Sequence, residues 1–366
     1  MTKVKAAFYR VGNSDIATDA FLRGVGLEPI TLLPVTTTTI TKGVFYAPEF
    51  ACFPFKVSVG MLKQALENGA KLFIMLGGNA QFTCQLEDFA QAQEYIMKKT
   101  GHEFEIIRFD SAKPNRIVAK FKKYNPKLTL RQAASALLLG RQKLLILDRL
   151  EEQYREIYLA VNKRRAETFK HRWEKKIDEK DSITGIYLLN GFMKKEFEEL
   201  PKANMQNVLK IAVIGDVYCL NEKAINNNIY ERLLDMGVYV DQSLKFSHMM
   251  GGAIGGAMIK SPREMLLENE SKKYLKHNVA GFAEHTVKDA IRYAEEGYDG
   301  LIHIYPFTCM PEITVRNILP KLGEDYHIPI LYLPIDEQTG DAGFTIRIEA
   351  FVDLIKIRKG KQEGKT

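Results

Sequence analysis

The sequence has few cysteines and lacks the spacings of the common metal, redox and nucleotide motifs. Its 366 residues contain four cysteines, and none belongs to a Cys-x-x-Cys pair, which argues against a zinc ribbon or a thioredoxin-type site. No expected strand is followed by Gly-x-Gly-x-x-Gly, so the standard dinucleotide fingerprint is also missing. Any function must therefore be inferred from where the reactive side chains fall along the chain.

Long apolar runs are absent as well. No run reaches about 18 residues, the length that indicates a membrane-spanning helix. Arg10 interrupts the N-terminal segment too early for the core of a signal peptide. We therefore expect a cytoplasmic protein that does not enter a membrane and whose thiols stay reduced. The net charge of +7 is modest, and no Arg/Lys stripe is interleaved with aromatic residues, so nucleic acid is not an expected partner.

Short apolar segments alternate with amphipathic segments of helical period in both parts of the chain. In the first part, the strand-like runs lie at 4–11, 29–33, 43–48, 71–78 and 104–109. In the second part, they return at 208–218, 238–244, 300–307 and 328–335. Strands that alternate with helices of this length indicate βαβ units and a mostly parallel sheet. We predict an α/β protein with two Rossmann-like domains.

The pattern changes between these two parts. Thr129 and Gln132 have capping-box spacing, and they precede a long, highly charged stretch with apolar residues at intervals of three and four. This stretch predicts a surface helix or helix pair, whose charges most simply form a solvated face. The expected organisation is an N-terminal α/β domain over residues 1–125, a helical connecting segment over 126–206 and a C-terminal α/β domain over 207–366.

All four cysteines are expected just beyond the ends of strands. They are Cys52 after 43–48, Cys84 after 71–78, Cys219 after 208–218 and Cys309 after 300–307. In open α/β sheets, ligands bind at the carboxyl edge of the strands. Structural thiols, which are usually buried, would also be expected inside strands and helices. The shared position therefore favours a functional role.

Thiols at such an edge suit two kinds of chemistry. A nucleophilic cysteine needs a base, and His303 and His285 are of the right type. However, nothing in the sequence places either beside a thiol, and His303 lies in an apolar strand where a core histidine is equally expected. Several thiolates from separate loops instead suit a soft metal or an iron–sulfur cluster. A stiff, apolar shell around such a site is predicted by the neighbours of Cys52 and Cys309, which are Phe53, Pro54, Phe55, Pro306, Phe307 and Pro311.

The glycine-rich sequence GGAIGGAMIKS at 251–261 has the composition of a phosphate-binding loop. Lys260 lies four residues after the last of its paired glycines rather than directly after it, so the Walker A spacing is not met. One interpretation is a flexible loop or close helix packing. The other is a cradle for a CoA phosphate, made by the backbone N–H groups of Gly251, Gly252, Gly255 and Gly256.

The segments around these cysteines resemble the 2-hydroxyacyl-CoA dehydratase component D family, in its activase-related branch. They are APEFACFPFK (47–56), KLFIMLGG with the later TC (71–84), IAVIGDVY (211–218) and GYDGLIHIYPFTCMPEI (297–313). The segment IPILYLPIDEQTGDAGFTIRIEAFVDLI (328–355) continues the likeness. The resemblance covers residues 4–110 and 208–357 and is weakest in the helical middle.

The resemblance implies a [4Fe–4S] cluster held by three cysteines in a cleft between two Rossmann-like domains. By motif, the ligands are Cys52, Cys84 and Cys309, which leaves one iron open to water or a substrate oxygen. In dehydratases of this family, one electron from an ATP-hydrolysing activator reaches the cluster and then the acyl-CoA thioester. The ketyl radical that forms expels the hydroxyl group. The expected protein is thus an oxygen-sensitive lyase with an activator protein as partner, an acyl-CoA substrate and a homodimeric or heterodimeric form.

Two departures from the family leave other functions open. Relatives commonly have Gly-Pro-Cys-Arg at the second ligand, where this sequence has Phe-Thr-Cys-Gln at 82–85, and this changes the surroundings of the expected cluster. Cys219 has no counterpart and is either a bystander or a fourth ligand. The alternative functions are a low-potential [4Fe–4S] or double-cubane reductase of small molecules, and a non-catalytic electron-transfer subunit.

Overall fold

A computed structural model describes residues 3–76, 85–109, 114–247 and 261–363. The chain forms two compact units. Unit 1 contains the described residues up to 203 together with 245–247, and unit 2 contains those from 204 to 244 and from 261 onward. The helices of the predicted connecting segment therefore lie in unit 1, up to Ala203.

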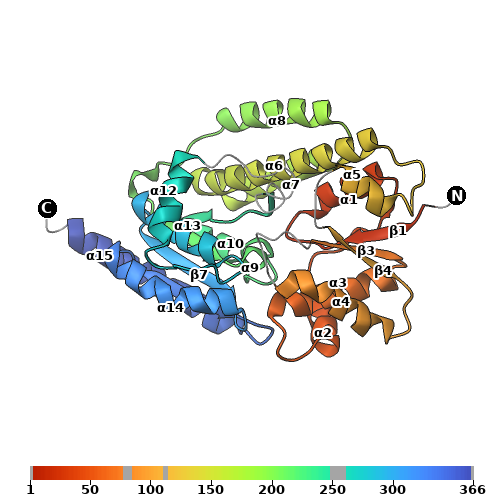
Figure 1. Ribbon diagram of the computed structural model, residues 1–366. Coiled ribbons are helices and arrows are strands. Elements are labelled where there is room, and N and C mark those ends of the chain that lie inside the picture. The colour runs from red at the N-terminus through yellow and green to blue at the C-terminus, as the bar shows by residue number, and fades with distance from the viewer. Residues whose placement is uncertain (1–2, 77–84, 110–113, 248–260, 364–366) are drawn as a thin grey trace. The chain divides into compact units, whose positions relative to one another are not determined.

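Unit 1 is built on a four-stranded parallel sheet with the strand order β2-β1-β3-β4 (Figure 1). Its strands are β1 (Lys5–Phe8), β2 (Glu28–Pro29), β3 (Leu72–Leu76) and β4 (Glu105–Phe109). Ala6 of β1 is level with Pro29 on one side and with Leu72 on the other. Ala6, Phe73 and Ile74 are completely buried, because helices cover the sheet and leave its central strands no contact with solvent.

Eight helices of unit 1 fall within the described ranges. They are α1 (Asp15–Gly24), α2 (Thr37–Tyr46), α3 (Phe53–Glu67), α4 (Gln85–Lys98), α5 (Pro114–Phe121), α6 (Leu130–Ala160), α7 (Lys163–Asp178) and α8 (Ile183–Glu198). The predicted capping box begins α6: Gln132 N donates to Thr129 Oγ1 at 3.3 Å, and Thr129 N donates to Gln132 Oε1 at 3.0 Å. The predicted helix pair is confirmed as α6 and α7, with α8 lying on the outside of this layer (Figure 1).

Unit 2 repeats the topology of unit 1, with the strand order β6-β5-β7-β8 and all neighbours parallel. Its strands are β5 (Lys210–Gly215), β6 (Tyr239–Gln242), β7 (Gly300–Pro306) and β8 (Ile330–Ile335). Every residue of β7 is buried. Its described helices are a 3₁₀ turn (Met205–Asn207), α9 (Val217–Asn221), α10 (Ile229–Asp235), α12 (Pro262–Ser271), α13 (Ala283–Glu295), α14 (Met310–Asp325) and α15 (Asp341–Glu363).

The predicted α/β class with two Rossmann-like parallel sheets is confirmed. In each sheet, the chain first adds a strand on one side of the opening strand and then crosses to its other side. The strand order thus reverses between β1 and β3 in unit 1 and between β5 and β7 in unit 2. Ligands of open α/β sheets bind at the carboxyl ends of the two strands that flank such a switch point.

The predicted strand at 43–48 is wrong, because residues 43–46 form the end of helix α2 and 47–48 follow it without strand structure. Thr36 and Thr39 form a reciprocal capping box that starts the helix. Gly43 then lets α2 approach α3 closely: a Cβ at position 43 would lie 1.9 Å from Lys56 O, and one at Gly60 would lie 2.0 Å from Thr39 O. Capping and backbone contact between the two helices thus override the strand preference of the Val-Phe-Tyr sequence.

Several other predicted strands are shorter than expected. The run at 29–33 contributes only Pro29 to β2. The run at 208–218 ends at Gly215, whose φ of +131° favours glycine and whose Cβ would lie 2.0 Å from Ile304 O. Asp216 then caps α9, so Cys219 lies in a helix and does not directly follow a strand.

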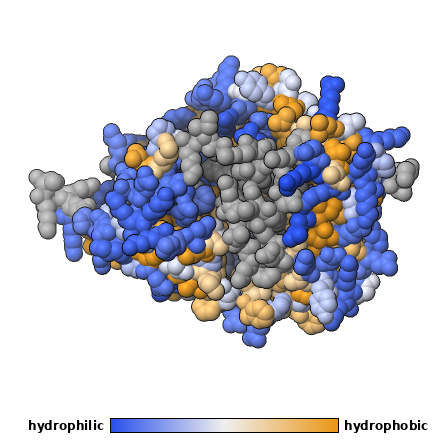
Figure 2. Space-filling view, in the orientation of Figure 1, coloured by the Kyte–Doolittle hydropathy of each residue, from blue (hydrophilic) through white to orange (hydrophobic). Residues whose placement is uncertain are grey.

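Among the coloured residues in Figure 2, hydrophilic ones predominate, and hydrophobic ones lie in separate patches. Large exposed apolar side chains include Phe45 on α2, Phe192 on α8, Met310 on α14 and Ile346 on α15. In the described part of the chain, no helix combines the length and the apolar character that crossing a bilayer requires.

Candidate functional site

Cys309 lies at the carboxyl edge of the unit 2 sheet, where β7 gives way to α14. Phe307 N donates to Ile335 O at 2.9 Å, and Cys309 N donates to Pro306 O at 2.9 Å, so the connection is a tight turn. Cys309 is the N-cap residue of α14, with φ −81° and ψ 102°, and it is half-buried. Pro311 falls in the first turn, where its fixed φ suits the helix and its missing N–H costs nothing.

Cys52 also precedes the first residue of a helix, in unit 1. It is the N-cap residue of α3, with φ −63° and ψ 154°, and it is also half-buried. Pro54 lies in the first turn, two residues after the cysteine, as Pro311 does after Cys309. Cys52 follows α2 rather than a strand, so the expectation that all four cysteines follow strands is wrong for this residue.

Both cysteines lie at the N-terminus of a helix. Unpaired backbone N–H groups and the helix dipole stabilise negative charge there, by about 0.3–1 kcal/mol for an exposed group. The thiolate is the form of cysteine that acts as a nucleophile or metal ligand. The repeated Cys-x-Pro arrangement thus places one sulfur atom at the start of a helix in each unit.

The apolar surroundings of these cysteines differ in part from the expectation. Phe53 and Phe55 are 5% and 1% exposed, so they belong to the core and do not form an open shell around Cys52. The exposed apolar neighbours in sequence are Phe50 near Cys52, and Phe307 and Met310 beside Cys309. Their side chains are 81%, 60% and 71% exposed, and they are available to keep water from a bound group or to contact a ligand.

A buried polar cluster lies beneath the start of α14. Glu312, in the first turn of this helix, is 1% exposed and contacts His303 of β7 and Thr286 of α13. Its carboxylate lies 2.8 Å from His303 Nε2 and accepts from Thr286 Oγ1 at 3.1 Å. His303 is completely buried, as the core interpretation of this histidine predicted, and stacks on Tyr305 with 4.5 Å between ring centroids.

Asp216 adds a second buried carboxyl group at the same edge, from the end of β5. It is 4% exposed and accepts from Tyr218 N and Cys219 N, both at 3.0 Å. Burial raises the pKa of Asp216 to about 6, and the nearby charge of Glu312 acts in the same direction, while the N–H of Cys219 opposes both. The switch point between β5 and β7 therefore brings together a thiol-bearing turn and a group that titrates close to neutral pH.

Cys219 has a structural role in this arrangement. It is completely buried within α9, and its side chain hydrogen-bonds the Asp216 carboxylate. A thiol in this position supports the N-terminal cap of its own helix. This geometry favours the bystander interpretation over that of a fourth metal ligand.

Several predicted site residues lie outside the described ranges. They are Cys84, Gly251, Gly252, Gly255 and Gly256. Within residues 3–76, 85–109, 114–247 and 261–363, no three His, Cys, Asp or Glu side chains are grouped so that they could hold a metal ion. The predicted ligand set includes Cys84 and so remains a prediction.

Sequence reasoning missed Asp216 and Glu312 as members of the site. Asp216 had a signal, because it directly follows the glycine that ends a buried strand, where N-cap residues are common. The Cys-x-Pro repeat was also visible, as CFP at 52–54 and CMP at 309–311. No sequence signal marked Glu312, because its partners His303 and Thr286 come from two other elements of the fold.

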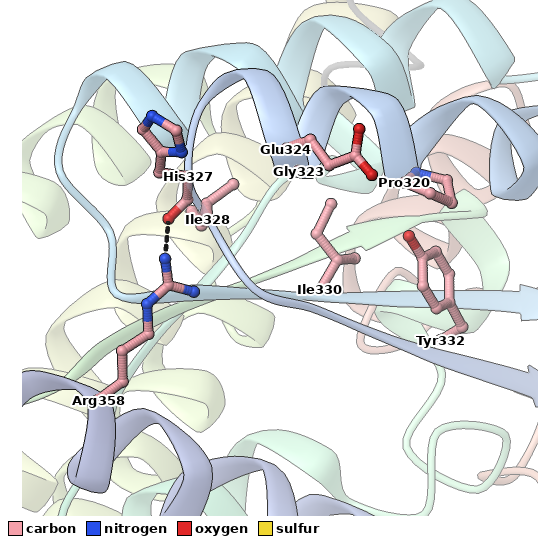
Figure 3. A pocket seen from close by; sticks show the side chains of 8 residues that line it. All are labelled: Pro320, Gly323, Glu324, His327, Ile328, Ile330, Tyr332 and Arg358. Carbon is pink, nitrogen blue, oxygen red and sulfur yellow. Dashed lines mark hydrogen bonds between the residues drawn. The ribbon is translucent and has the colours of Figure 1, made fainter.

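A hollow of about 330 Å³ lies at the opposite edge of the unit 2 sheet (Figure 3). It is lined by Pro320, Gly323, Glu324, His327, Ile328, Ile330, Tyr332 and Arg358. Ile330 is the first residue of β8, so the hollow lies at the amino end of that strand. Because ligands in this fold class bind at the carboxyl ends, we do not include the hollow in the candidate site.

Replacing Asp216 with asparagine is expected to stabilise the protein in a pH-dependent way. Because the pKa of Asp216 is raised from 3.8 to about 6, the folded protein loses stability as the pH rises through this interval. Asp216→Asn removes that cost and keeps a side-chain oxygen for the cap. The unfolding free energy should rise by about 3 kcal/mol at about pH 8 and should not change near pH 3. Denaturant titrations across this range measure the difference, and an equal effect at every pH would contradict the burial argument.

Comparison with known proteins places most of unit 1 and the start of unit 2 in a family. Residues 16–241 match the family described as the CoA enzyme activase uncharacterised domain. This match includes Cys52, Cys84 and Cys219 and ends before Cys309. No curated protein matches the chain. Since the match covers more than half of the 366 residues, the chain belongs to the family of the CoA enzyme activase uncharacterised domain.

Proposed function

We propose that this chain is an iron–sulfur protein of the 2-hydroxyacyl-CoA dehydratase type. It binds a [4Fe–4S] cluster with Cys52, Cys84 and Cys309 as ligands and removes the hydroxyl group of a hydroxyacyl-CoA. The observation that carries the proposal is the shared presentation of Cys52 and Cys309, each a half-buried N-cap residue followed by proline two positions later. Membership of a family named for CoA enzyme activases supports the link to CoA substrates.

The donor atoms suit the proposed cluster. Iron–sulfur clusters are held by cysteine thiolates, and the start of a helix stabilises a thiolate. Cys219 differs from Cys52 and Cys309, because it is completely buried and its side chain is bound to Asp216. This difference supports a set of three protein ligands.

The chain's own residues hold the thiols in place and restrict water. When bound, the cluster would supply single electrons at low potential. Pro54 and Pro311 fix the first turns of α3 and α14. Glu312, anchored to His303 and Thr286, ties the first turn of α14 to the sheet and so keeps the Cys309 turn in position. The exposed Phe50, Phe307 and Met310 provide apolar surface near the thiols.

Two partners belong to this proposal. The electron donor in this proposal is an ATP-dependent activator protein, as the resemblance implies. The family description, which names a CoA enzyme activase, supports a partner in such a system. The substrate is an acyl-CoA, and the glycines at 251, 252, 255 and 256 are proposed to bind a phosphate of its CoA part through their backbone N–H groups. With dehydration as its reaction, the protein would be a lyase.

The substrate part of the proposal is tested by spectroscopy of the reduced, anaerobically purified protein. A 2-hydroxyacyl-CoA is expected to change the electron paramagnetic resonance spectrum, because one iron is left open to a substrate oxygen. Free CoA and the free hydroxy acid serve as controls and should cause no such change. If the cluster is intact but no acyl-CoA tested changes its spectrum, the dehydratase function is contradicted and the role of a non-catalytic electron-transfer subunit is favoured.

A further inference from the structure

Helix α15 has apolar side chains on two opposite faces. Those of the inner face are buried in unit 2, and they are Phe344, Ile348, Phe351, Val352 and Ile355. This face packs against the start of β7, where a Cβ at Gly300 would lie 2.5 Å from Ile355 Cδ1 and 3.0 Å from Phe351 Cζ. The contacts that α15 needs in order to fold onto its own sheet are thus already made.

The outer face carries a second apolar stripe, formed by Ile346, Ala350, Leu354 and Ile357. All four residues are exposed, and the three large side chains are 63%, 52% and 60% exposed in chain order. Their spacing of i, i+4, i+8 and i+11 keeps them on one side of the helix. Spacings of three and four residues are typical of the seam along which two helices pack. A helix that is apolar on both faces usually has a neighbour on both.

We propose that this outer stripe joins two copies of the chain into a two-fold dimer, in which the two α15 helices pack antiparallel. A two-fold axis brings the same surface patch of both copies into contact, so the patch must be complementary to an antiparallel copy of itself. With Ile346 opposite Ile357 of the second copy, Ala350 comes opposite Leu354 of the second copy. The small side chain of Ala350 then leaves space for Leu354 of the second copy. The pairs of Ile346 with Ile357 lie at the two ends of the contact.

The charges along α15 also favour pairing with a second copy. Glu349 lies in the first half of the described helix and Asp353 just past its midpoint, whereas Lys356, Arg358, Lys359 and Lys361 lie toward its end. Within the chain, Lys356 lies 3.7 Å from Asp353, and Lys359 lies 2.9 Å from Asp299. In an antiparallel pair, Glu349 of each helix faces the basic end of the other. Glu349 and Lys356 lie on the same side of the apolar stripe, because seven residues make about two helical turns. They come nearly level with each other in the proposed pairing.

The other side of the stripe carries two arginines that are turned toward their own sheet. Arg347 Nη2 donates to Tyr332 O at 2.5 Å, and Arg358 Nη2 donates to His327 O at 2.9 Å (Figure 3 shows the second contact). Both guanidinium groups therefore bind backbone oxygens at the edge strand β8 and the loop before it. This arrangement limits the repulsion that two like charges would cause across the dimer.

Helix α8 offers a competing apolar surface but a less suitable one. Its exposed Ile183, Tyr187, Leu188 and Phe192 are spread over about half of the helix circumference, because they are spaced by four, one and four residues. Charged residues of both helices form ion pairs within the chain, Lys194 with Glu198 on α8 and Lys356 with Asp353 on α15, so these pairs do not distinguish the two surfaces. The narrow apolar stripe of α15, with Glu349 and Lys356 on one side of it, fits a self-complementary contact better.

The dimer is tested on the full chain by sedimentation velocity and light scattering. The wild-type protein is expected at twice the chain mass of 41.7 kDa. Leu354→Glu should shift the protein to the single-chain mass. Its melting temperature should equal that of the wild-type protein diluted until it is monomeric. The matched control is Leu188→Glu on α8, which changes the same residue type at 55% instead of 52% exposure and should leave the dimer intact.

A charge exchange tests the antiparallel arrangement separately from folding. Glu349→Lys should weaken the dimer at low salt, and the double variant Glu349→Lys/Lys356→Glu should restore it. A monomeric wild-type protein, a Leu354→Glu variant that still dimerises, or dissociation by Leu188→Glu instead would each overturn the proposal. These experiments determine molecular mass and do not depend on bound iron. Their outcome therefore tests the dimer independently of the proposed cluster.

Discussion

Replacing Gly43 with alanine is expected to lower the free energy of unfolding by about 3 kcal/mol. The added Cβ would lie 1.9 Å from the backbone oxygen of Lys56, and no flexible side chain can move aside to relieve the clash. Helices α2 and α3 would have to separate, and the buried side chains between them would lose contact. Denaturant titration with an unchanged m-value would measure this loss.

Gly191→Ala is the matched control for this prediction. Gly191 also lies inside a helix, α8, but a Cβ at this position meets nothing within 4 Å. The exchange should raise the free energy of unfolding by about 0.5–1 kcal/mol, because glycine in a helix is less favourable than alanine. Equal effects of the two substitutions would show that close contact between α2 and α3 is not what Gly43 provides.

The second large effect is expected for the iron content of cysteine variants. Cys52→Ser, Cys84→Ser and Cys309→Ser should each remove or degrade the proposed cluster, because each takes away one of three thiolate ligands. Cys219→Ser is the control, since Cys219 is completely buried and its side chain is bound to Asp216. It should keep its iron. Iron analysis of the four variants, with circular dichroism to confirm folding, makes the comparison.

The outcome for Cys219 decides between two ligand sets. If Cys219→Ser loses iron while one of the other three variants keeps it, the assignment of ligands is wrong. If all four variants lose iron, the fourth cysteine is a ligand or the fold of α9 supports the site. We expect that, of the four variants, only Cys219→Ser retains its iron.

Much of the fold follows from the order of apolar periods along the chain. Buried runs such as 300–307 form central parallel strands because helices cover both faces of the sheet, and β7 is accordingly buried throughout. The capping box at Thr129 and Gln132 marked the start of α6 to the residue. Local signals of this kind act within one turn of helix or one strand, so they can be read without knowing the rest of the structure.

The errors arose where contacts between distant residues decide the local structure. The Val-Phe-Tyr run near residue 45 has strand propensity, but Gly43 and Gly60 let α2 lie against α3, and this packing favours a helix. The candidate site shows the same limit. Glu312, His303 and Thr286 come from α14, β7 and α13, and only the folded sheet brings them together.

The family and the structure thus support different parts of the proposal. The sequence match assigns the chain to the CoA enzyme activase uncharacterised domain. The structure adds the repeated Cys-x-Pro start of α3 and α14 and the structural role of Cys219. The presence of the cluster itself is the claim on which the proposed reaction depends.

Iron and acid-labile sulfide in protein purified under strictly anaerobic conditions test that claim most directly. A [4Fe–4S] cluster predicts equal amounts of the two, about four of each per chain, together with a brown colour that oxygen bleaches. A folded, colourless protein that contains neither iron nor sulfide under these conditions would contradict the proposed function.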